Sequence, residues 1–502
     1  MPGKCRIIYP DSFFQTYSIL NNHVERKVTL MTQFRIEKDF LGTKQIPGNV
    51  YYGIQTARAI ENFPITGYRP HRKLIIALAM VKKAAVLANA ETGSLNPRLA
   101  EAIAQSAQEI IDGVLHDQFV VDVIQGGAGT SMNMNANEVI ANRAIELLGA
   151  EKGDYRVVHP NIHVNMAQST NDVFPTAIRI ATLRLAALTQ KALQGLVGTV
   201  EMKAREFDPV IKMGRTHLQD AVPIRLGQEF RAWARILRRD AVRIERALES
   251  FLEVNMGATA VGTGLNADPQ YIVAVVNQLK EITGLPLRTA EDLVDATQNT
   301  DMYVELSGDL KTLAGNLSKI ANDLRLMASG PRAGLGEINL PSLQPGSSIM
   351  PGKVNPVIPE VVNQVAFQVT GNDITISRAA EAGQLELNVM EPVLVFNLLQ
   401  SLDILRNVML IFSEKCIKGI TANVRHCREM VENSVGIVTA INPHVGYEVA
   451  SQVAKEAIAT GRPVRELVLE RGILTEEELD IILNPYEMTE PGIAGKELLG
   501  KE

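Results

Sequence analysis

Aromatic residues and cysteine are both scarce in this chain. Aromatic side chains make up 5% of its 502 residues, with one tryptophan. Alanine, leucine, isoleucine, valine and methionine must therefore fill the core, and their close packing between helices favours a mainly helical fold. The three cysteines, Cys5, Cys416 and Cys427, cannot all pair with one another, and none lies in a CxxC motif. A disulfide scaffold is excluded, and we expect a reducing compartment, the cytoplasm.

An excess of one charge and long hydrophobic runs are also missing. Fifty basic residues against 56 acidic ones leave a net charge of −6, with no long block of either sign. This pattern lacks the basic footprint of a nucleic-acid-binding protein. The longest uninterrupted apolar stretch, residues 74–81, is far shorter than the roughly 20 residues that span a bilayer. We expect a soluble protein that binds neither nucleic acid nor membranes.

The first 30 residues differ from the rest of the chain. They show neither helical nor strand periodicity, and they lack the apolar segment and small-residue cleavage site of a signal peptide. We interpret residues 1–30 as an N-terminal extension. The folded body is expected to begin at Met31, which is also a candidate for the true start of translation.

Stretches without glycine or proline predict the main helices. Residues 228–256 and 393–418 contain neither residue, and residues 176–208 and 301–329 contain only isolated glycines. Apolar residues in 228–256 recur at intervals of three and four, which places them in one stripe along a helix. Several such helices imply a bundle. Residues 393–418 are apolar on more than one side, so we expect some helices to pack against other subunits.

Four segments rich in glycine, hydroxyl and amide residues interrupt the helical patterns: QGGAGTSMNMN (125–135), AQSTNDVFPTA (167–177), GRTHLQDAVP (214–223) and PGSSIMPGKVNP (345–356). Each is predicted to precede a helix, and helix capping alone would explain any one of them. Together they indicate a small-anion site, because helix starts offer free N–H groups and a favourable dipole. The charge is expected from Lys353 and the neutral donors from Thr130, Ser169, Thr170, Asn171, Thr216, Ser347, Ser348 and Asn355.

Other kinds of site find no support in the motifs. The fourth segment is similar to a phosphate loop, but five residues separate Gly346 from Gly352, and Val354 stands where Ser or Thr is required. No GxGxxG, HExxH or GxSxG motif occurs, and the eight histidines have no metal-ligand spacing. We therefore expect neither a nucleotide site nor a metal site.

The fourth segment has the composition of a mobile loop that closes over a substrate, with glycines and prolines that set its bends. A serine alkoxide forms near neutral pH only where hydrogen-bond donors and positive charge stabilise it. Ser347, near Lys353 and backbone N–H groups, is therefore a candidate base. The alternative is a serine that only shapes the loop.

In this order, the four segments resemble the aspartase/fumarase superfamily, whose signature loop GSSIMPGKVNP is present in the fourth. The resemblance runs from about Met31 to the C-terminus. Class II fumarases carry Ser-Ser where this chain has Ser169-Thr170, and they continue differently from residues 357–364. Within the superfamily the chain is similar to the aspartate ammonia-lyases in FRIEKDFLG, YYGIQTARAIENF, QSTNDVFPTA, GRTHLQDAVP, GATAVGTGLNADP and PGKVNPVIPEVVNQV.

The resemblance implies a mainly α, three-domain aspartase/fumarase fold. An N-terminal domain would cover residues 31–168, a central long-helix bundle 169–423 and a small C-terminal domain 424–502. The family implies a homotetramer with a twenty-helix core, whose active sites are each shared by three subunits. It also implies reversible deamination of L-aspartate to fumarate and ammonia without an organic cofactor. Activation by a divalent cation stays open.

The resemblance also assigns roles to residues. Ser347 would take the proton from the carbon beside the β-carboxylate, and the charge would spread into that group as an aci-carboxylate. The positions that match hydrogen-bond donors to the β-carboxylate are Thr130, Ser169, Thr170 and Ser348. Those that match the α-carboxylate holders are Thr216, Lys353 and Asn355. Contacts near the amino group match Asn171 and His217.

Four further residues receive weaker assignments. Glu360 matches a glutamate that pairs in related enzymes with a histidine at the position of His217, to which we assign binding and orientation rather than proton transfer. A polar core histidine is the alternative for His217. Arg58 and Lys44 match positions linked to activity. His159 falls where fumarases have a second anion site, although a surface or capping role is favoured here.

Two alternatives to an aspartate ammonia-lyase stay open. One is a class II fumarate hydratase, and the other is a catalytically silent structural homologue, as lens crystallins of the wider superfamily are. The intact motifs argue against the silent homologue.

Overall fold

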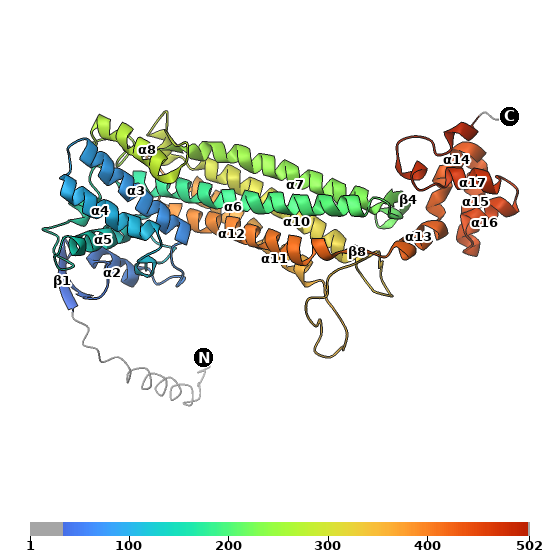
Figure 1. Cartoon of the computed structure of the whole chain (residues 1–502), viewed down its shortest axis with the longest axis horizontal. Helices are drawn as coiled ribbons and strands as arrows, with labels where there is room; N and C mark the ends of the chain where they lie inside the picture. The colour runs from blue at the N-terminus through green and yellow to red at the C-terminus, as the bar shows by residue number, and fades with distance from the viewer. Residues whose placement is uncertain (1–33, 500–502) are drawn as a thin grey trace, which may run out of the picture. The chain divides into compact units, whose positions relative to one another are not determined.

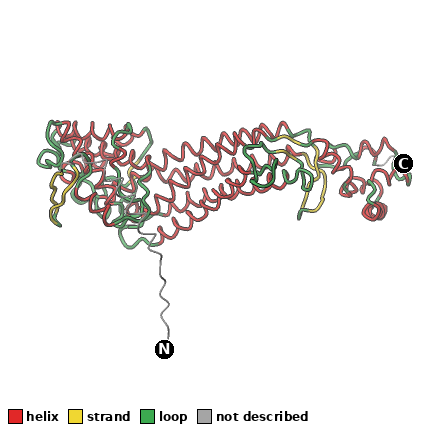
Figure 2. Tube along the Cα trace, turned by 90° about the horizontal axis from the view of Figure 1, so that it is seen from below, coloured by secondary structure: helices red, strands yellow, loops and turns green. Residues whose placement is uncertain are grey.

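A computed structural model describes residues 34–499 of the chain. The N-terminal extension, Cys5 and the proposed start at Met31 lie outside the described residues. Helices dominate the described part, and the strands are short and paired only in twos (Figure 2). The mainly helical fold expected from the sequence is confirmed. The chain divides into two compact units, and the sequence-based boundaries at residues 168 and 423 stay predictions.

The first unit comprises the chain up to Phe174 together with Met256–Ala260 and Gly264–Gly284. Its centre is α3, which packs against α4, α5 and α8. The buried residues of α3 are Leu, Ile, Val, Met and Ala, as the shortage of aromatics predicts, together with Lys82 and Asn89. The elements are β1 (Phe34–Asp39), β2 (Gly42–Pro47), α2 (Ile54–Asn62), α3 (Arg72–Glu91), α4 (Pro97–Ile111), η1 (His116–Gln118), α5 (Thr130–Leu147), the π-helix η2 (Pro160–Val164) and α8 (Pro269–Thr283).

The second unit holds a bundle of long helices (Figure 1). Within it, α10 packs against α7, α11 and α12, and α11 packs against α12. The bundle helices are α6 (Thr170–Glu206, of which the second unit holds the part from Pro175), α7 (Leu226–Leu248), α10 (Asp301–Met327), α11 (Val357–Glu381) and α12 (Glu391–Lys415). Shorter elements of the bundle region are β3 (Ile211–Thr216), β4 (Gln219–Arg225), η3 (Glu249–Leu252), β5 (Glu253–Val254), β6 (Arg288–Thr289), α9 (Asp295–Gln298), β7 (Ile338–Asn339), η4 (Ile417–Gly419) and β8 (Thr421–Ala422).

Hydroxyl groups join α6 to its neighbour in the bundle. The Thr189 hydroxyl donates to the Leu402 carbonyl oxygen at 3.1 Å, and the Thr199 and Ser413 hydroxyls lie 2.8 Å apart. These contacts join α6 to α12 at two points along the helices. Because one of these hydrogen bonds is buried and the other half-buried, they fix the register between the two helices as well as their distance.

The helix predicted over residues 228–256 ends earlier, at Leu248. No glycine or proline stops it. The chain tightens into the single 3-10 turn η3 and then extends into β5, where Val254 pairs with Thr289 of β6. Tertiary pairing therefore ends the helix where local sequence would let it continue. The helix predicted over 176–208 starts earlier, at Thr170, with Pro175 inside it.

The apolar helix predicted over residues 393–418 is α12. Its segment Glu391–Gly419 is long and apolar enough to cross a membrane by length and composition, although polar residues interrupt it so that no long uninterrupted apolar stretch occurs in it. However, 56% of its most apolar window is buried inside the structure. A core helix of a bundle passes the same test, and α12 packs against α10 and α11.

The helices that follow the bundle form a small apolar core with a hairpin. They are α13 (Val424–Asn433), η5 (Val435–Ile437), α14 (Val438–Val445), α15 (Tyr447–Thr460), α16 (Val464–Glu470), α17 (Glu476–Ile482), η6 (Glu487–Thr489) and η7 (Lys496–Leu498). Ile211 and Met213 of β3 are buried in the same core as Leu467 and Leu479. These helices therefore support the underside of the β3–β4 hairpin.

Both described cysteines are free and buried. Burial raises the pKa of Cys416 to about 12 and that of Cys427 to about 11. A thiol with so high a pKa carries little thiolate near neutral pH and is a poor nucleophile. Each of these cysteines is a packing residue.

Candidate functional site

The helix α5 begins at Thr130, the first of the predicted anion-binding residues. The turn before it runs through positive φ angles, 54° at Ala128 and 86° at Gly129. A side chain at Gly129 would place its Cβ 2.4 Å from the Phe174 ring, so glycine is required by space as well as by conformation. Thr130 itself is exposed, and the N-cap residue Gly129 has no side chain that could cap the helix. In the first turn of α5, the Thr130 N–H donates to the Gly127 carbonyl oxygen at 2.9 Å and the Met132 N–H to Gln125 Oε1 at 3.2 Å, so the exposed group that α5 offers a ligand here is the Thr130 side chain.

The helix α6 begins with Ser169, Thr170 and Asn171 in contact with buried groups. The Ser169 hydroxyl accepts from the Asn171 backbone N–H at 3.2 Å, and the Ser169 N–H donates to Asp172 Oδ1 at 3.0 Å. This reciprocal capping explains why the helix starts before Pro175. The Thr170 hydroxyl oxygen accepts from Asn133 Nδ2 at 3.0 Å, which brings α5 and α6 together.

Asp172 holds a distant segment against the start of α6. Its Oδ2 atom accepts from the backbone N–H groups of Gly257 and Thr259 at 3.2 and 3.0 Å. The Asn171 amide donates to the carbonyl oxygen of Ala260 in the same segment at 2.7 Å. Burial raises the pKa of Asp172 to about 7. Asp172 and Asn171 together place the segment GATA beside the Ser-Thr pair.

A buried lysine that the sequence analysis missed lies behind this helix start. Lys82 of α3 is fully buried, and its ammonium donates to Asn165 Oδ1 and Gln168 Oε1 at 2.8 Å each. Burial lowers the pKa of Lys82 to about 7, against an opposing effect of Asp172. A lysine within a helical pattern normally indicates a solvent-facing position, so the only available signal was its place in the apolar run 74–88.

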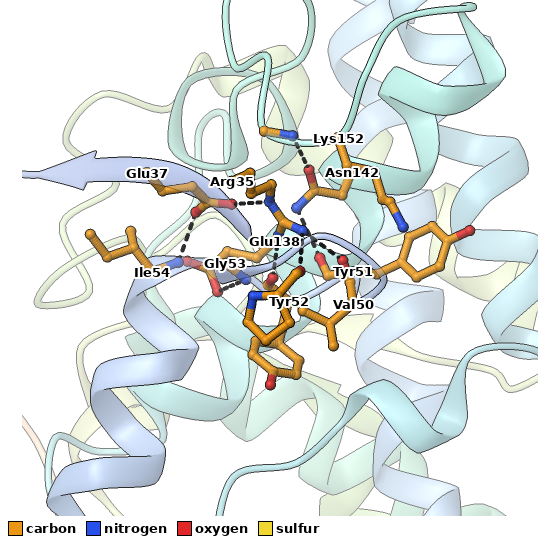
Figure 3. Close-up of polar contacts among 12 residues, drawn as sticks. Arg35, Glu37, Val50, Tyr51, Tyr52, Gly53, Ile54, Glu138, Asn142 and Lys152 are labelled. Atoms are coloured by element: carbon orange, nitrogen blue, oxygen red, sulfur yellow. Dashed lines mark hydrogen bonds and ion pairs between the residues drawn. The ribbon is translucent and has the colours of Figure 1, made fainter. Parts of the chain in front are cut away.

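A second buried group holds α2 (Figure 3). Glu138 of α5 accepts from the backbone N–H groups of Gly53, Gln55 and Thr56 and from the Thr56 hydroxyl, at 2.6–3.1 Å. Its carboxylate thereby caps the N-terminus of α2, where the helix dipole favours negative charge. Burial nevertheless raises the pKa of Glu138 to about 7. Because Glu138 ties α2 to α5 in this way, the backbone of α2 that carries Arg58 is held in place.

Three residues with weaker assignments also lie in the first unit. Arg58 donates through two nitrogens to Asp39, at 2.8 and 2.9 Å, so its charge is already paired. Lys44 pairs with Glu61 at 2.7 Å. His159 caps η2, with its Nδ1 accepting from the Asn161 and Ile162 N–H groups at 3.0 and 3.3 Å. The capping role favoured for His159 is confirmed.

Thr216 and His217 lie in the second unit, on a β-hairpin. The segment GRTHLQDAVP does precede a helix, α7, which begins three residues after Pro223, but the segment itself is a hairpin that contributes to β3 and β4, a structure the sequence did not predict. His217 and Leu218 turn the chain with φ angles of 54° and 60°. Thr216 and His217 are both exposed at this turn. A hairpin of this kind presents the two side chains without using a helix dipole.

The predicted mobile loop lies between β7 and α11. Its ends are held together by the Gly346 N–H, which donates to the Lys353 carbonyl oxygen, and by Asn355 Nδ2, which donates to the Gly346 carbonyl oxygen, both at 2.7 Å. A Cβ at Gly346 would lie 2.8 Å from the backbone nitrogen of Asn355, so only glycine lets the two ends of the loop come this close. Ser348 and Lys353 are exposed. These two hydrogen bonds close the base of the loop, with Ser347 and Asn355 half-buried.

Ser347 stands at the turn of this loop. Its hydroxyl oxygen accepts from the backbone N–H groups of Ile349 and Met350, at 3.2 and 3.1 Å. Two N–H donors aimed at one oxygen stabilise negative charge there. The geometry fits both the candidate base and the loop-shaping serine, since one pair of bonds serves either role.

The predicted residues thus gather in two groups, described within their own units. Thr130, Ser169, Thr170 and Asn171 lie in the first unit, and Thr216, His217, Ser347, Ser348, Lys353 and Asn355 lie in the second. Glu360 is in the first turn of α11, and among residues 34–499 no hydrogen bond or ion pair joins it to His217. Within the same residues, no group of three or more His, Cys, Asp or Glu side chains could hold a metal ion.

Comparisons with known proteins agree with these motifs. The sequence pattern of the Lyase family matches residues 42–371, and that of the Fumarase C C-terminus matches residues 437–490. Aspartate ammonia-lyase of Bacillus subtilis (strain 168) is 65% identical over 469 residues, which cover 93% of this chain and 99% of the relative.

Solved structures agree as well. A structure titled fumarate lyase:delta crystallin from Brucella melitensis bound to cobalt superposes with a TM-score of 0.89 at 52% identity, covering 91% of this chain and 100% of that one. A recombinant class II fumarase from Schistosoma mansoni reaches a TM-score of 0.86 at 36% identity with the same coverage. The extent of the Lyase pattern and the identity to the Bacillus relative show that the chain belongs to the aspartate ammonia-lyases of the aspartase/fumarase superfamily.

Proposed function

We propose that this protein catalyses the reversible deamination of L-aspartate to fumarate and ammonia. The name of the Bacillus subtilis relative supports the substrate, because that relative is similar over nearly its whole length. The observation that carries the chemistry is the pair of backbone N–H groups aimed at the Ser347 oxygen. They stabilise an alkoxide, which is the form of serine able to act as a base.

In the proposed reaction the Ser347 alkoxide takes a proton from the carbon beside the β-carboxylate. The electron pair of that C–H bond moves into the carboxylate, which becomes an aci-carboxylate. When the pair returns to form the double bond, the C–N bond breaks and the nitrogen leaves as ammonia. The proton on Ser347 then passes to solvent, which restores the base, and the released ammonia takes up a proton from solvent to become ammonium. Fumarate and ammonium account for every atom of the substrate.

The neutral donors suit charge that appears only during the reaction. Donors that are already aimed need no reorganisation when the second negative charge develops on the β-carboxylate. This role falls to the hydroxyl groups of Thr130, Ser169, Thr170 and Ser348. The α-carboxylate is charged throughout, so a permanent cation, Lys353, suits it, with Thr216 and Asn355 as further donors. Asn171 and His217 contact the amino group.

We propose further that the enzyme is a cytoplasmic homotetramer whose active sites each draw on three subunits, and that it works without an organic cofactor. Exposed apolar residues on the bundle support the tetramer. Phe367 and Ile374 on α11 are 68% and 59% exposed in the single chain. Large apolar side chains so exposed on one long helix are typical of a helix that packs against another subunit.

The test follows the ultraviolet absorbance of fumarate while either L-aspartate or L-malate is added to the purified protein. We expect fumarate to form from L-aspartate, with ammonia released in equal amount. Strong turnover of L-malate with none of L-aspartate would instead identify a fumarate hydratase. No turnover of either by a folded protein would identify a silent homologue.

A further inference from the structure

Lys82 makes its hydrogen bonds to two side-chain amides rather than to a carboxylate. Its ammonium lies 2.8 Å from Asn165 Oδ1 and 2.8 Å from Gln168 Oε1. An ammonium has donors and no acceptor, so each amide must turn its oxygen toward it. A lysine that has lost one proton still carries two hydrogens, enough for both contacts.

The nitrogen atoms of the same two amides are occupied on their other sides. Asn165 Nδ2 donates to the Gln168 carbonyl oxygen at 3.1 Å. Gln168 Nε2 donates to the carbonyl oxygens of Val164 and Met166 at 3.0 and 3.1 Å. Reversing either amide would set an NH₂ group against the lysine and an oxygen against a carbonyl. The orientation of Asn165 is therefore fixed from both ends.

The orientation of the Asn165 amide determines that of the Asn133 amide. Asn165 presents its oxygen to Asn133, so Asn133 must answer with its nitrogen, which lies 3.3 Å away. The same nitrogen donates to the Thr170 hydroxyl oxygen at 3.0 Å. The Thr170 oxygen is thereby used as an acceptor, and among residues 34–499 no group accepts the Thr170 proton.

We propose that Lys82 is a positioning residue which, through Asn165 and Asn133, directs the Thr170 hydroxyl proton toward the β-carboxylate of the substrate. The chain of contacts alternates donor and acceptor from the ammonium to the hydroxyl, so the direction of each member follows from the one before. This inference rests on the proposed function. It adds the reason why Thr170 is a donor from the start rather than a hydroxyl free to rotate.

The expected gain lies in the transition state. A hydroxyl that is already oriented as a donor need not reorient when charge develops on the carboxylate. A freely rotating hydroxyl must first be oriented, which costs free energy. Loss of the Asn133 contact should therefore lower kcat more than it raises KM. A residue with only a packing role would instead lower the amount of folded enzyme and leave both constants of the folded fraction unchanged.

The first test is a double-mutant cycle on L-aspartate deamination, with the variants Asn133→Leu and Thr170→Val and their combination. Both replacements keep approximate shape and remove hydrogen bonding. We expect each single variant to lower kcat roughly tenfold to hundredfold. The double variant should be little worse than Thr170→Val, because Asn133 has no hydroxyl left to direct.

Asn137→Leu is the matched control. Asn137 is as buried as Asn133, lies one turn along the same helix and donates to the same Asn165 oxygen at 3.1 Å, but it does not contact Thr170. Its kcat should stay near the wild-type value. Additive losses in the cycle, or an equal loss in Asn137→Leu, would overturn the positioning role while wild-type turnover of L-aspartate left the proposed function standing.

The second test needs neither a variant nor activity. Neutron diffraction from deuterium-exchanged wild-type crystals locates the deuterons on Lys82, Asn133 and Thr170. We expect Asn133 to present its ND₂ group to the Thr170 oxygen and the Thr170 deuteron to point away from Asn133. A Thr170 hydroxyl deuteron pointing at Asn133, with the oxygen of the Asn133 amide turned toward it, would refute the inference whatever substrate the enzyme uses.

Discussion

The hydroxyl oxygen of Ser347 lies 3.1 Å from the backbone nitrogen of Met350 and accepts its hydrogen bond. A second N–H, that of Ile349, donates to the same oxygen at 3.2 Å. Both donors come from the loop that carries the serine, so they would move together with it in the loop closure that the sequence predicts. Stabilisation of a Ser347 alkoxide would therefore not depend on where the loop lies.

Replacing Ser347 by alanine should abolish most turnover. Loss of a general base costs roughly 10²- to 10⁴-fold in kcat, whereas loss of a hydroxyl from an exposed loop changes the free energy of unfolding by only about 0.5 kcal/mol. Steady-state kinetics and thermal unfolding of Ser347→Ala measure the two effects. A Ser347→Ala enzyme that keeps most of its kcat would return Ser347 to the role of shaping the loop.

Lys353→Met should weaken binding of the substrate α-carboxylate. Lys353 is exposed, and among the described residues no carboxylate pairs with it, so its charge is available to a ligand. A hydrogen bond to a charged group contributes about 1.5–3 kcal/mol, so kcat/KM for L-aspartate should fall roughly tenfold to hundredfold. Lys418→Met removes an exposed lysine that pairs with Glu414 and serves as the control. Equal kinetics in the two variants would remove Lys353 from the site.

Gly129→Ala should destabilise the start of α5. The Cβ of the new alanine would lie 2.4 Å from the Phe174 ring, and the alanine backbone would have to adopt a φ of 86°. Gly149, just past the other end of α5, is the matched control, because its φ is 82° and nothing lies within 4 Å of its Cβ. Denaturant unfolding should show Gly149→Ala losing about 1 kcal/mol and Gly129→Ala clearly more. Equal losses would mean that the ring moves aside freely.

Glu138→Gln should change how stability depends on pH. Burial raises the pKa of Glu138 from 4.5 to about 7, so between these values the folded protein binds more protons at this site than the unfolded chain does. The stabilising contribution is complete below pH 4.5 and is lost as the pH rises toward 7, which makes the free energy of unfolding fall over this window. Glu138→Gln removes the part of this fall that belongs to Glu138, so its free energy of unfolding should fall less steeply with pH than that of the wild type, and other buried carboxylates, Asp172 among them, contribute to the remainder.

Denaturant unfolding at several pH values across the window measures the slope for both proteins. Glu101→Gln, at an exposed position on α4, is the control and should keep the wild-type slope. If Glu138→Gln also keeps that slope, the Glu138 carboxylate titrates near its ordinary value, held there by the four donors at the start of α2.

Sequence patterns predicted the helices well and the hairpin poorly, for physical reasons. The helix α12 follows from an apolar run without glycine or proline, and its observed bounds lie within three residues of the prediction. The β3–β4 hairpin turns at His217-Leu218 in left-handed conformations that usually call for Asn or Gly, so no turn signal marks it. The antiparallel pairing of β3 with β4 and the packing of Ile211 and Met213 in the core of the C-terminal helices hold it.

The polar residues behind the site were missed for a different reason. Lys82 and Glu138 sit on helices where a charged side chain ordinarily faces solvent. What buries them is their set of partners, and Glu138 bonds to backbone groups more than 80 positions away in the chain. A pattern read along one helix carries no trace of such partners, whereas the hydroxyl and amide residues of the site stand in short motifs that a sequence displays directly.

The seating of the β3–β4 hairpin has a consequence for shortened forms of the chain. The Ser434 hydroxyl donates to Asp220 Oδ2 at 2.8 Å across 214 positions of sequence, and a Cβ at Gly436 would lie 2.2 Å from the Ala221 carbonyl oxygen. Proteolytic clipping after Asn433 would release this contact and uncover Ile211 and Met213. Loss of residues 434–499 would then remove support from the turn that bears Thr216 and His217, although none of these residues is proposed to touch the substrate.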